Sequence, residues 1–214
     1  MKNKIILSIL LGISLSSCTR DNINEDQHAR YDVTSESLIT YAEKELSDFL
    51  NTPNVNENNF RLTMQYWQEA TYVNESNYDF TNRNVANNIW TDNYVNVLNN
   101  LNKAKELISN YQPTPSELSY WPVKKQNQLA IADMMMVFTY QTLVDIHGDI
   151  PYTQSLNNAE FPLPVYDNDS DIYPKLITRL KEDLSKLQNG GAFGSADIVY
   201  NGNIGQWKKF GNSL

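Results

Sequence analysis

Apolar residues recur at helical spacing in five segments of the chain, and this periodicity constrains the fold more than any other feature of the sequence. The segments span about residues 35–50, 59–73, 84–109, 124–146 and 169–187. Apolar side chains three or four positions apart share one face of an α-helix. No segment alternates apolar and polar residues for long enough to predict a strand. Because short turns join long helices, the sequence predicts an all-α, antiparallel helical array.

Residues that begin or end helices flank several of these segments. The run Thr34–Ser37 forms a cap-like start before the first segment, and Pro113 and Pro115 follow the third. The fourth segment, 124–146, is so apolar that we expect it at the centre of the core. Gly148 then ends this segment, since glycine tolerates the positive φ of a helix terminus.

The start of the chain has the pattern of a bacterial lipoprotein signal peptide. Two lysines, an uncharged apolar run from Ile5 to Leu15, and two serines precede Cys18. The apolar run is too short for a permanent membrane span, which needs roughly 20 residues. Cys18 is the only cysteine of the chain, so it has no intramolecular disulfide partner. We therefore predict removal of residues 1–17 and lipidation of Cys18.

The residues after the cysteine predict a solvated tether rather than a folded element. The segment 18–33 is polar and lacks helical periodicity, so the folded part is expected to comprise residues 34–214. Removing the two lysines of the signal peptide changes the net charge from −8 to −10. Nucleic-acid binding requires a basic surface, and this acidic balance excludes it.

The composition is rich in residue types that suit a ligand with neutral hydrogen-bonding groups and apolar faces. The chain contains 13 Tyr, 4 Trp and 28 Asn. Sugars stack on aromatic rings while their hydroxyl groups bond to uncharged partners. Composition alone favours the alternative, that these residues reflect codon bias and a core rich in aromatics.

Three polar segments partly match the sequence patterns of known metal or phosphate sites. Asp145–Asp149 offers two carboxylates and an imidazole, but helix termination, with a charged His147 at the negative end of the helix dipole, explains it better. Asp167–Asp171 begins like a calcium loop but fails the EF-hand pattern, so helix capping is favoured and a looser calcium site stays open. The glycines of 189–195 lack the lysine of a phosphate loop. The sequence therefore predicts no metal site, no cofactor and no catalytic triad.

Polar and aromatic residues outside the apolar faces are the candidate ligand contacts. These are Tyr72, Asn74, Tyr78 and Asp79, in the loop expected after the second helix, and Trp121, in the loop expected before the fourth. Trp67 and Trp90 fall on helix faces and are expected in the core instead.

Several blocks of sequence resemble the SusD/RagB family of nutrient-binding outer-membrane lipoproteins. The block Gly148–Tyr152, Gly-Asp-Ile-Pro-Tyr, is the most specific of them. The other blocks that carry the resemblance are Arg61–Trp67 followed by Tyr72, the helix from Trp90 to Leu101, Asp171–Tyr173 and the terminal Trp207–Leu214.

The resemblance implies a fold of tetratricopeptide-like helix pairs and a SusC-type TonB-dependent transporter as partner. It also implies an outer-membrane location and delivery of an oligosaccharide or other nutrient without catalysis. The acidic residues after Cys18 favour display at the cell surface. Members of this family are usually more than twice as long, and the helix that begins near Gln206 has no stop signal before Leu214, so we expect a truncated protein. The rival functions are a helical scaffold that binds only protein and, less favoured, a glycan hydrolase, whose two carboxylates sequence alone does not position.

Overall fold

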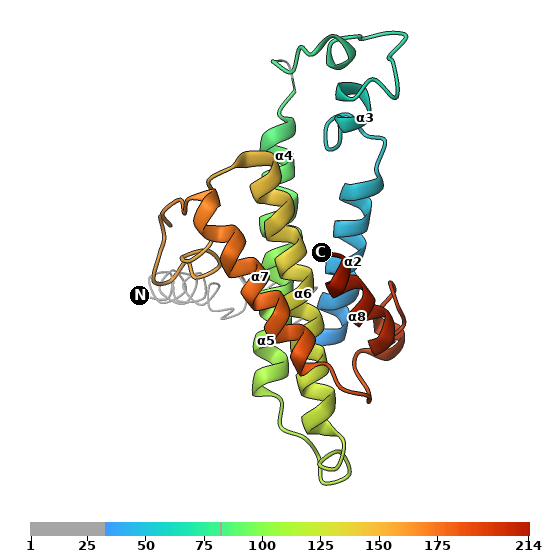
Figure 1. The fold of residues 1–214 in the computed structure, drawn as a ribbon, viewed down its shortest axis with the longest axis vertical. Helices are drawn as coiled ribbons and strands as arrows, with labels where there is room; N and C mark the ends of the chain where they lie inside the picture. The colour runs from blue at the N-terminus through green and yellow to red at the C-terminus, as the bar shows by residue number, and fades with distance from the viewer. Residues whose placement is uncertain (1–32, 82) are drawn as a thin grey trace, which may run out of the picture. The chain divides into compact units, whose positions relative to one another are not determined.

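Helices are the regular elements of the described residues, 33–81 and 83–214, in this computed structural model (Figure 1). The predicted signal peptide, Cys18 and nearly all of the tether lie outside these residues. The longer helices are α2 (Ser35–Asn51), α4 (Val85–Thr91), α5 (Asn99–Asn110), α6 (Trp121–His147), α7 (Asp169–Lys186) and α8 (Ile204–Ser213). The shorter ones are α3 (Phe60–Thr63), η1 (Glu75–Asn77) and η3 (Gly194–Ala196). Within the described residues, extended pairing is limited to a bridge between Ile150 and Asp167, so the all-α prediction is confirmed.

One long helix is built from α4, α5 and the π-helical segment η2 (Asp92–Leu98) that joins them without interruption. A π-helical turn has longer-range hydrogen bonds than an α-turn and disturbs the regular backbone pattern. The buried Asn93 compensates at this point, because its Nδ2 donates to the carbonyl oxygen of Ile89 at 2.8 Å. The helix predicted over 84–109 is therefore confirmed, with a local widening that periodicity did not indicate.

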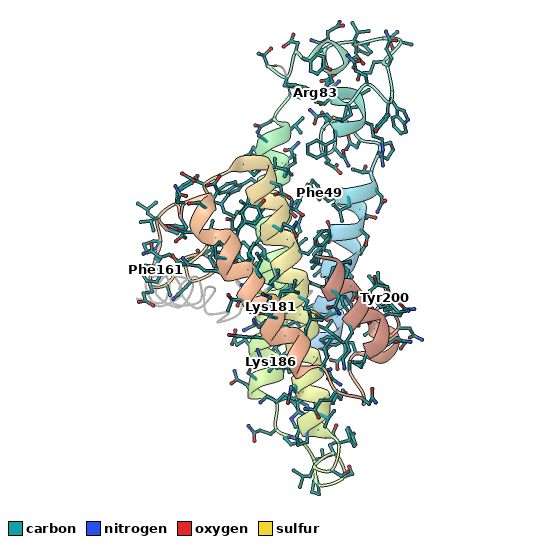
Figure 2. All side chains as sticks on the ribbon, viewed as in Figure 1. Phe49, Arg83, Phe161, Lys181, Lys186 and Tyr200 are labelled. Carbon is teal, nitrogen blue, oxygen red and sulfur yellow. The ribbon has the colours of Figure 1, made fainter. Side chains whose placement is uncertain are left out.

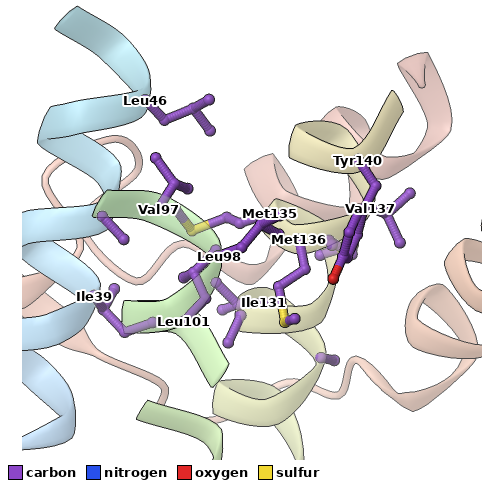
Figure 3. Close-up of a cluster of buried hydrophobic side chains, with 14 of the residues drawn as sticks. Ile39, Leu46, Val97, Leu98, Leu101, Ile131, Met135, Met136, Val137 and Tyr140 are labelled. Atoms are coloured by element: carbon purple, nitrogen blue, oxygen red, sulfur yellow. The ribbon is translucent and has the colours of Figure 1, made fainter. Parts of the chain in front are cut away.

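Helix α6 lies at the centre of the core, as its apolar sequence predicted. It packs against α5 on one side and α7 on another (Figure 1). Ile131, Met135 and Met136 of α6 lie close to Leu98 and Leu101 of the preceding helix (Figure 3). The helix is long and apolar enough to cross a membrane, yet most of its apolar stretch is buried by its neighbours. Its hydrophobicity is explained by this burial.

Helix α8 is held in place by a buried carboxylate just before it. The indole of Trp207 is 1% exposed, and its Nε1 donates to Asp197 Oδ2 at 2.6 Å. Asp197 also accepts the backbone amides of Tyr200 and Gly202, both at 2.8 Å. The carboxyl of Glu43, on α2, accepts the amide of Ile198 at 2.7 Å. These bonds connect α8 and the turn before it to the first described helix.

The predicted starts of α2 and α7 and the predicted end of α6 agree with the capping geometry. Thr34 Oγ1 accepts the amide of Ser37 at 3.2 Å, as expected for an N-cap. Gly148 ends α6 with φ +74°, in the conformation that glycine tolerates best. The chain then leaves in an extended direction through Pro151, and Asn168 caps α7 by accepting the amide of Ser170 at 3.0 Å.

The helix predicted over 59–73 is wrong. Only α3 forms there, and the backbone turns to positive φ at Gln65 (57°) and Tyr72 (59°). An L-residue in this region interrupts a right-handed helix. Trp67, which is expected in the core, is exposed, and so is Met64 three positions before it. No core surface covers this face, so helical spacing alone did not produce a helix.

Candidate functional site: an exposed aromatic loop

The segment after α2 carries a concentration of exposed aromatic side chains. We call residues 60–80 the aromatic loop; Arg83, labelled in Figure 2, follows it, and α3 marks its start in Figure 1. Its exposed aromatic residues are Phe60, Tyr66, Trp67, Tyr72 and Tyr78. Exposed aromatic residues that share one segment are a feature of binding surfaces.

Arg61 attaches the start of the loop to the end of α2. Its guanidinium donates to the carbonyl oxygens of Thr52 at 2.8 Å and Asn51 at 3.1 Å. These carbonyls belong to the helix terminus, where backbone acceptors lack helical partners. The same guanidinium lies 5.0 Å from the ring centroid of Trp67, whose indole is 51% exposed. Trp67 is therefore held in position by a cation–π contact while much of its surface remains open.

A buried carboxylate fixes the second half of the loop. Glu75 is 1% exposed and forms an ion pair with Arg83. Arg83 Nη1 also donates to Asn56 Oδ1 at 2.9 Å, which ties this part of the loop to the segment after α2. The Ser76 hydroxyl accepts the amide of Glu69 at 2.8 Å. The exposed rings therefore stand on a backbone with specific internal contacts.

Four of the five predicted ligand residues lie together in this loop. Tyr72 is 83% exposed, and Tyr78 is half exposed with its hydroxyl donating to Thr63 O at 2.9 Å. Asn74 Nδ2 donates to Asp79 Oδ2 at 3.3 Å. Hydrogen bonds from Thr81 lower the pKa of Asp79 below its usual value, so this carboxylate is charged at neutral pH.

Trp121 does not join them. It is the first residue of α6 rather than a loop residue, and that end of α6 lies far from α3 (Figure 1). Its indole is only 8% exposed, with the ring of Tyr111 at 4.5 Å between centroids. The prediction that Trp121 stands in an open loop is wrong, because the helix starts three residues earlier than the apolar pattern indicated.

The sequence predicts that Trp67 and Trp90 lie in the core. Trp90 is half-buried and packs against the main hydrophobic cluster, as expected. Trp67 is exposed, contrary to the prediction, and sequence reasoning therefore missed it as a candidate contact. Positions 60, 64 and 67 fit helical spacing, which predicted a shared buried face. The positive φ of Gln65 and Tyr72 could not be predicted, because these residue types rarely adopt it.

The polar segments around α6 and α7 have structural roles. His147 ends α6, and burial lowers its pKa, which disfavours the charged imidazole expected at the negative end of the helix dipole. Asp167 accepts the amides of Tyr152 at 2.9 Å and Thr153 at 2.7 Å. In the described part of the chain, no three His, Cys, Asp or Glu side chains form a group with metal-binding geometry.

Comparison with known proteins gives the family. Residues 26–214 match the family model for SusD-like proteins, described as starch-binding and associating with the outer membrane. The chain belongs to the SusD-like family. No curated protein matches this SusD-like chain at a significant level.

Solved structures similar to this SusD-like chain share its helical fold. A chitin-binding protein matches with a TM-score of 0.63 and 26% identity, over 84% of this chain and 37% of its own. The SusD-like protein of Bacteroidetes AC2a matches with a TM-score of 0.61 and 24% identity, over 85% of this chain and 32% of its own. A SusD/RagB family protein from Bacteroides thetaiotaomicron matches with a TM-score of 0.56 and 16% identity, over 84% of this chain and 36% of its own. The chain thus spans about a third of the length of these structures.

In this SusD-like chain, the aromatic loop offers ring faces and neutral hydrogen-bonding groups. Its three acidic residues are each engaged by protein donors: Asp79 by Thr81, Glu69 by Ser76, and Glu75 by Arg83. These contacts help to fix the backbone from which the exposed rings project.

Proposed function

We propose that this SusD-like chain binds a neutral oligosaccharide on the aromatic loop and does not cleave it. The observation that carries the proposal is the set of exposed rings on a backbone fixed by the Arg61 and Glu75 contacts. Tyr72, Asn74, Tyr78 and Asp79 are the proposed contacts. Trp121 is not included, since its ring is used for packing.

Pyranose rings present C–H faces that pack on aromatic rings and hydroxyl groups that need polar partners. Aromatic contacts contribute about 0.5–1.5 kcal/mol each beyond the area they bury. Tyr72 is open enough to offer a ring face, and the Asn74 amide offers donors beside it. Several such contacts in series give modest affinity for one sugar unit and higher affinity for an oligosaccharide.

The ligand class is suggested by the family and by one structural relative. The family description is starch-binding, and one similar structure is of a chitin-binding protein. Both polymers are uncharged chains of pyranose rings. We therefore propose an uncharged glucan or an N-acetylglucosamine oligomer as ligand.

The membrane role is proposed on different grounds. The leader and Cys18 match a lipoprotein signal, and the family description includes association with the outer membrane. We propose that lipid on Cys18 anchors the protein at the cell surface. In this position it would pass its ligand to a SusC-type TonB-dependent transporter.

Isothermal titration calorimetry of the full chain with maltoheptaose and with chitohexaose tests the ligand proposal. We expect saturable heat with one of them, and Tyr72→Ala to weaken binding about fivefold to tenfold through loss of a stacking face. Tyr120→Ala, an exposed tyrosine outside the loop, is the matched control and should bind like the parent. Absence of heat with both sugars would leave the scaffold role, and release of shortened sugars during incubation would indicate a hydrolase.

A further inference from the structure

An aromatic pocket lies between the long helix and the segment that follows Gly148. It has a volume of about 340 Å³, within the range of small-molecule sites, and Phe161 in Figure 2 marks the segment that borders it. Its lining includes Trp90, Tyr94, Val95, Asn99, Pro151 and Asn158. None of the residues of the aromatic loop lines this pocket.

The lining of this pocket is apolar on one side and neutral polar on the other. Trp90, Tyr94 and Pro151 supply flat apolar surfaces, while Asn99 and Asn158 supply amides. Both amides are exposed, and neither side chain is hydrogen-bonded to another described residue. No lining residue carries a charge. This set disfavours an ionic ligand and matches a polyol with apolar ring faces.

The aromatic wall is held rigidly before any ligand arrives. Tyr166 stacks on Trp90 at 5.9 Å between centroids, with 26° between the ring planes. His147 meets the same indole edge-on at 5.2 Å. The Tyr94 hydroxyl donates to the carbonyl oxygen of Pro151 at 2.6 Å, which joins the helix to the bordering segment. A fixed wall lowers the entropy cost of binding, which favours recognition of a small rigid ring.

We propose that this pocket is a second glycan site, which takes a terminal pyranose unit of a neutral oligosaccharide. One ring face packs against Trp90 and Tyr94, and the ring hydroxyls bond to Asn99 and Asn158. The site shares its ligand class with the proposed function but none of its residues, so the two are tested separately.

The four tryptophans make the test direct. In a ¹⁵N-tryptophan-labelled full chain, each indole N–H gives one signal, which is assigned by substitution. Trp67 reports on the aromatic loop and Trp90 on the pocket, while the buried Trp207, bonded to Asp197, serves as an internal reference. Titration with maltoheptaose and chitohexaose should shift the Trp90 signal saturably and leave that of Trp207 unchanged.

Val95→Arg places a long side chain at the pocket without changing the loop, since Val95 is an exposed lining residue. We expect it to weaken the binding reported by Trp90 at least about tenfold through loss of ring packing, and to leave that reported by Trp67 within about twofold. Ile177→Arg, at an exposed helical position on α7, is the matched control and should leave both unchanged.

The outcomes separate the two proposals. A Trp90 shift that Val95→Arg abolishes supports the second site, even if Trp67 does not respond and the loop proposal fails. A Trp90 signal that stays fixed while Trp67 saturates overturns the second site alone. A Trp90 shift that survives Val95→Arg places the sugar elsewhere and also overturns it. If neither indole responds to either sugar, both proposals fail.

Discussion

Two carboxyl groups meet inside the protein where α2 faces the turn before α8. Glu43 is 1% exposed, and burial together with the negative charge of Asp197 raises its pKa from 4.5 to about 8. Its carboxyl is therefore protonated in the folded protein at neutral pH. A neutral Glu43 can accept the amide of Ile198 and lie near Asp197 without like-charge repulsion.

This raised pKa predicts a pH-dependent stability. Between about pH 4.5 and 8 the folded chain holds a proton on Glu43 that the unfolded chain releases. The stabilisation of the folded state by this proton is fully present below the Glu43 pKa of the unfolded chain. It is lost as pH rises through the Glu43 pKa of the folded chain, at up to about 1.4 kcal/mol per pH unit. Glu43→Gln, neutral at every pH, should flatten this fall and be more stable than the parent at pH 8.

Urea unfolding at pH 5, 6.5 and 8 measures the effect. Glu106→Gln, on the exposed face of α5, is the control and should follow the parent at each pH. Part of the slope should remain in Glu43→Gln, because burial beside Asp133 raises the pKa of Asp183 to about 7. Parallel pH profiles for the parent and Glu43→Gln would contradict the prediction.

At the scale of elements, sequence periodicity identified the helices that have a core to pack against. The patterns for α2, the α4–α5 helix, α6 and α7 were confirmed because each apolar face meets another helix. The pattern over 59–73 failed because no neighbour buries its face. Periodicity shows which side chains share a face and does not show whether anything covers it.

The difference between a local sequence pattern and actual burial also explains which candidate-site residues the sequence could predict. Four of the predicted residues do lie in one exposed loop, because polar and aromatic residues outside the apolar faces can be identified locally; their role as ligand contacts stays a prediction. Trp67 was missed because its spacing mimicked a core position, and Trp121 was misplaced because α6 begins earlier than its apolar stripe. The pocket beside Trp90 depends on contacts between segments about 60 residues apart, which one sequence does not indicate.

The attachment of α8 predicts the effect of changing its anchor. Asp197→Asn keeps the size of the side chain but presents an amide where four N–H groups converge, so at least one donor loses its acceptor. Bonds to charged groups contribute about 1.5–3 kcal/mol each, and we expect a loss of at least about 2 kcal/mol in unfolding free energy. Urea unfolding measures it, with the exposed Asp171→Asn as a control expected to change by less than about 0.5 kcal/mol. Equal midpoints would show that the anchor is not needed.

At the scale of the molecule, the described part of the chain covers about a third of the similar structures, and residues 26–214 all fall within the family match. The helical pairs are therefore shared with larger proteins of the same family.

Membrane attachment is predicted to depend on a single sulfur atom. Cys18→Ser removes the lipidation site, so the protein should move from the membrane fraction to the soluble fraction when cells are fractionated. Mass spectrometry of the parent should show a mature chain that begins at a lipid-modified Cys18. A parent protein with a free thiol at this position, or with another start site, would refute the anchor.

Tyr72 combines a positive φ of 59° with an almost fully open side chain. Folding alone would favour glycine there, because an L-residue in this conformation costs roughly 1–2 kcal/mol and the ring regains little by packing. Tyr72→Gly should therefore raise the free energy of unfolding and lower the affinity for the proposed sugar ligand. A gain in folding stability at this position is therefore expected to accompany a loss of sugar affinity. Thermal melting and calorimetry on this one variant would measure the two effects.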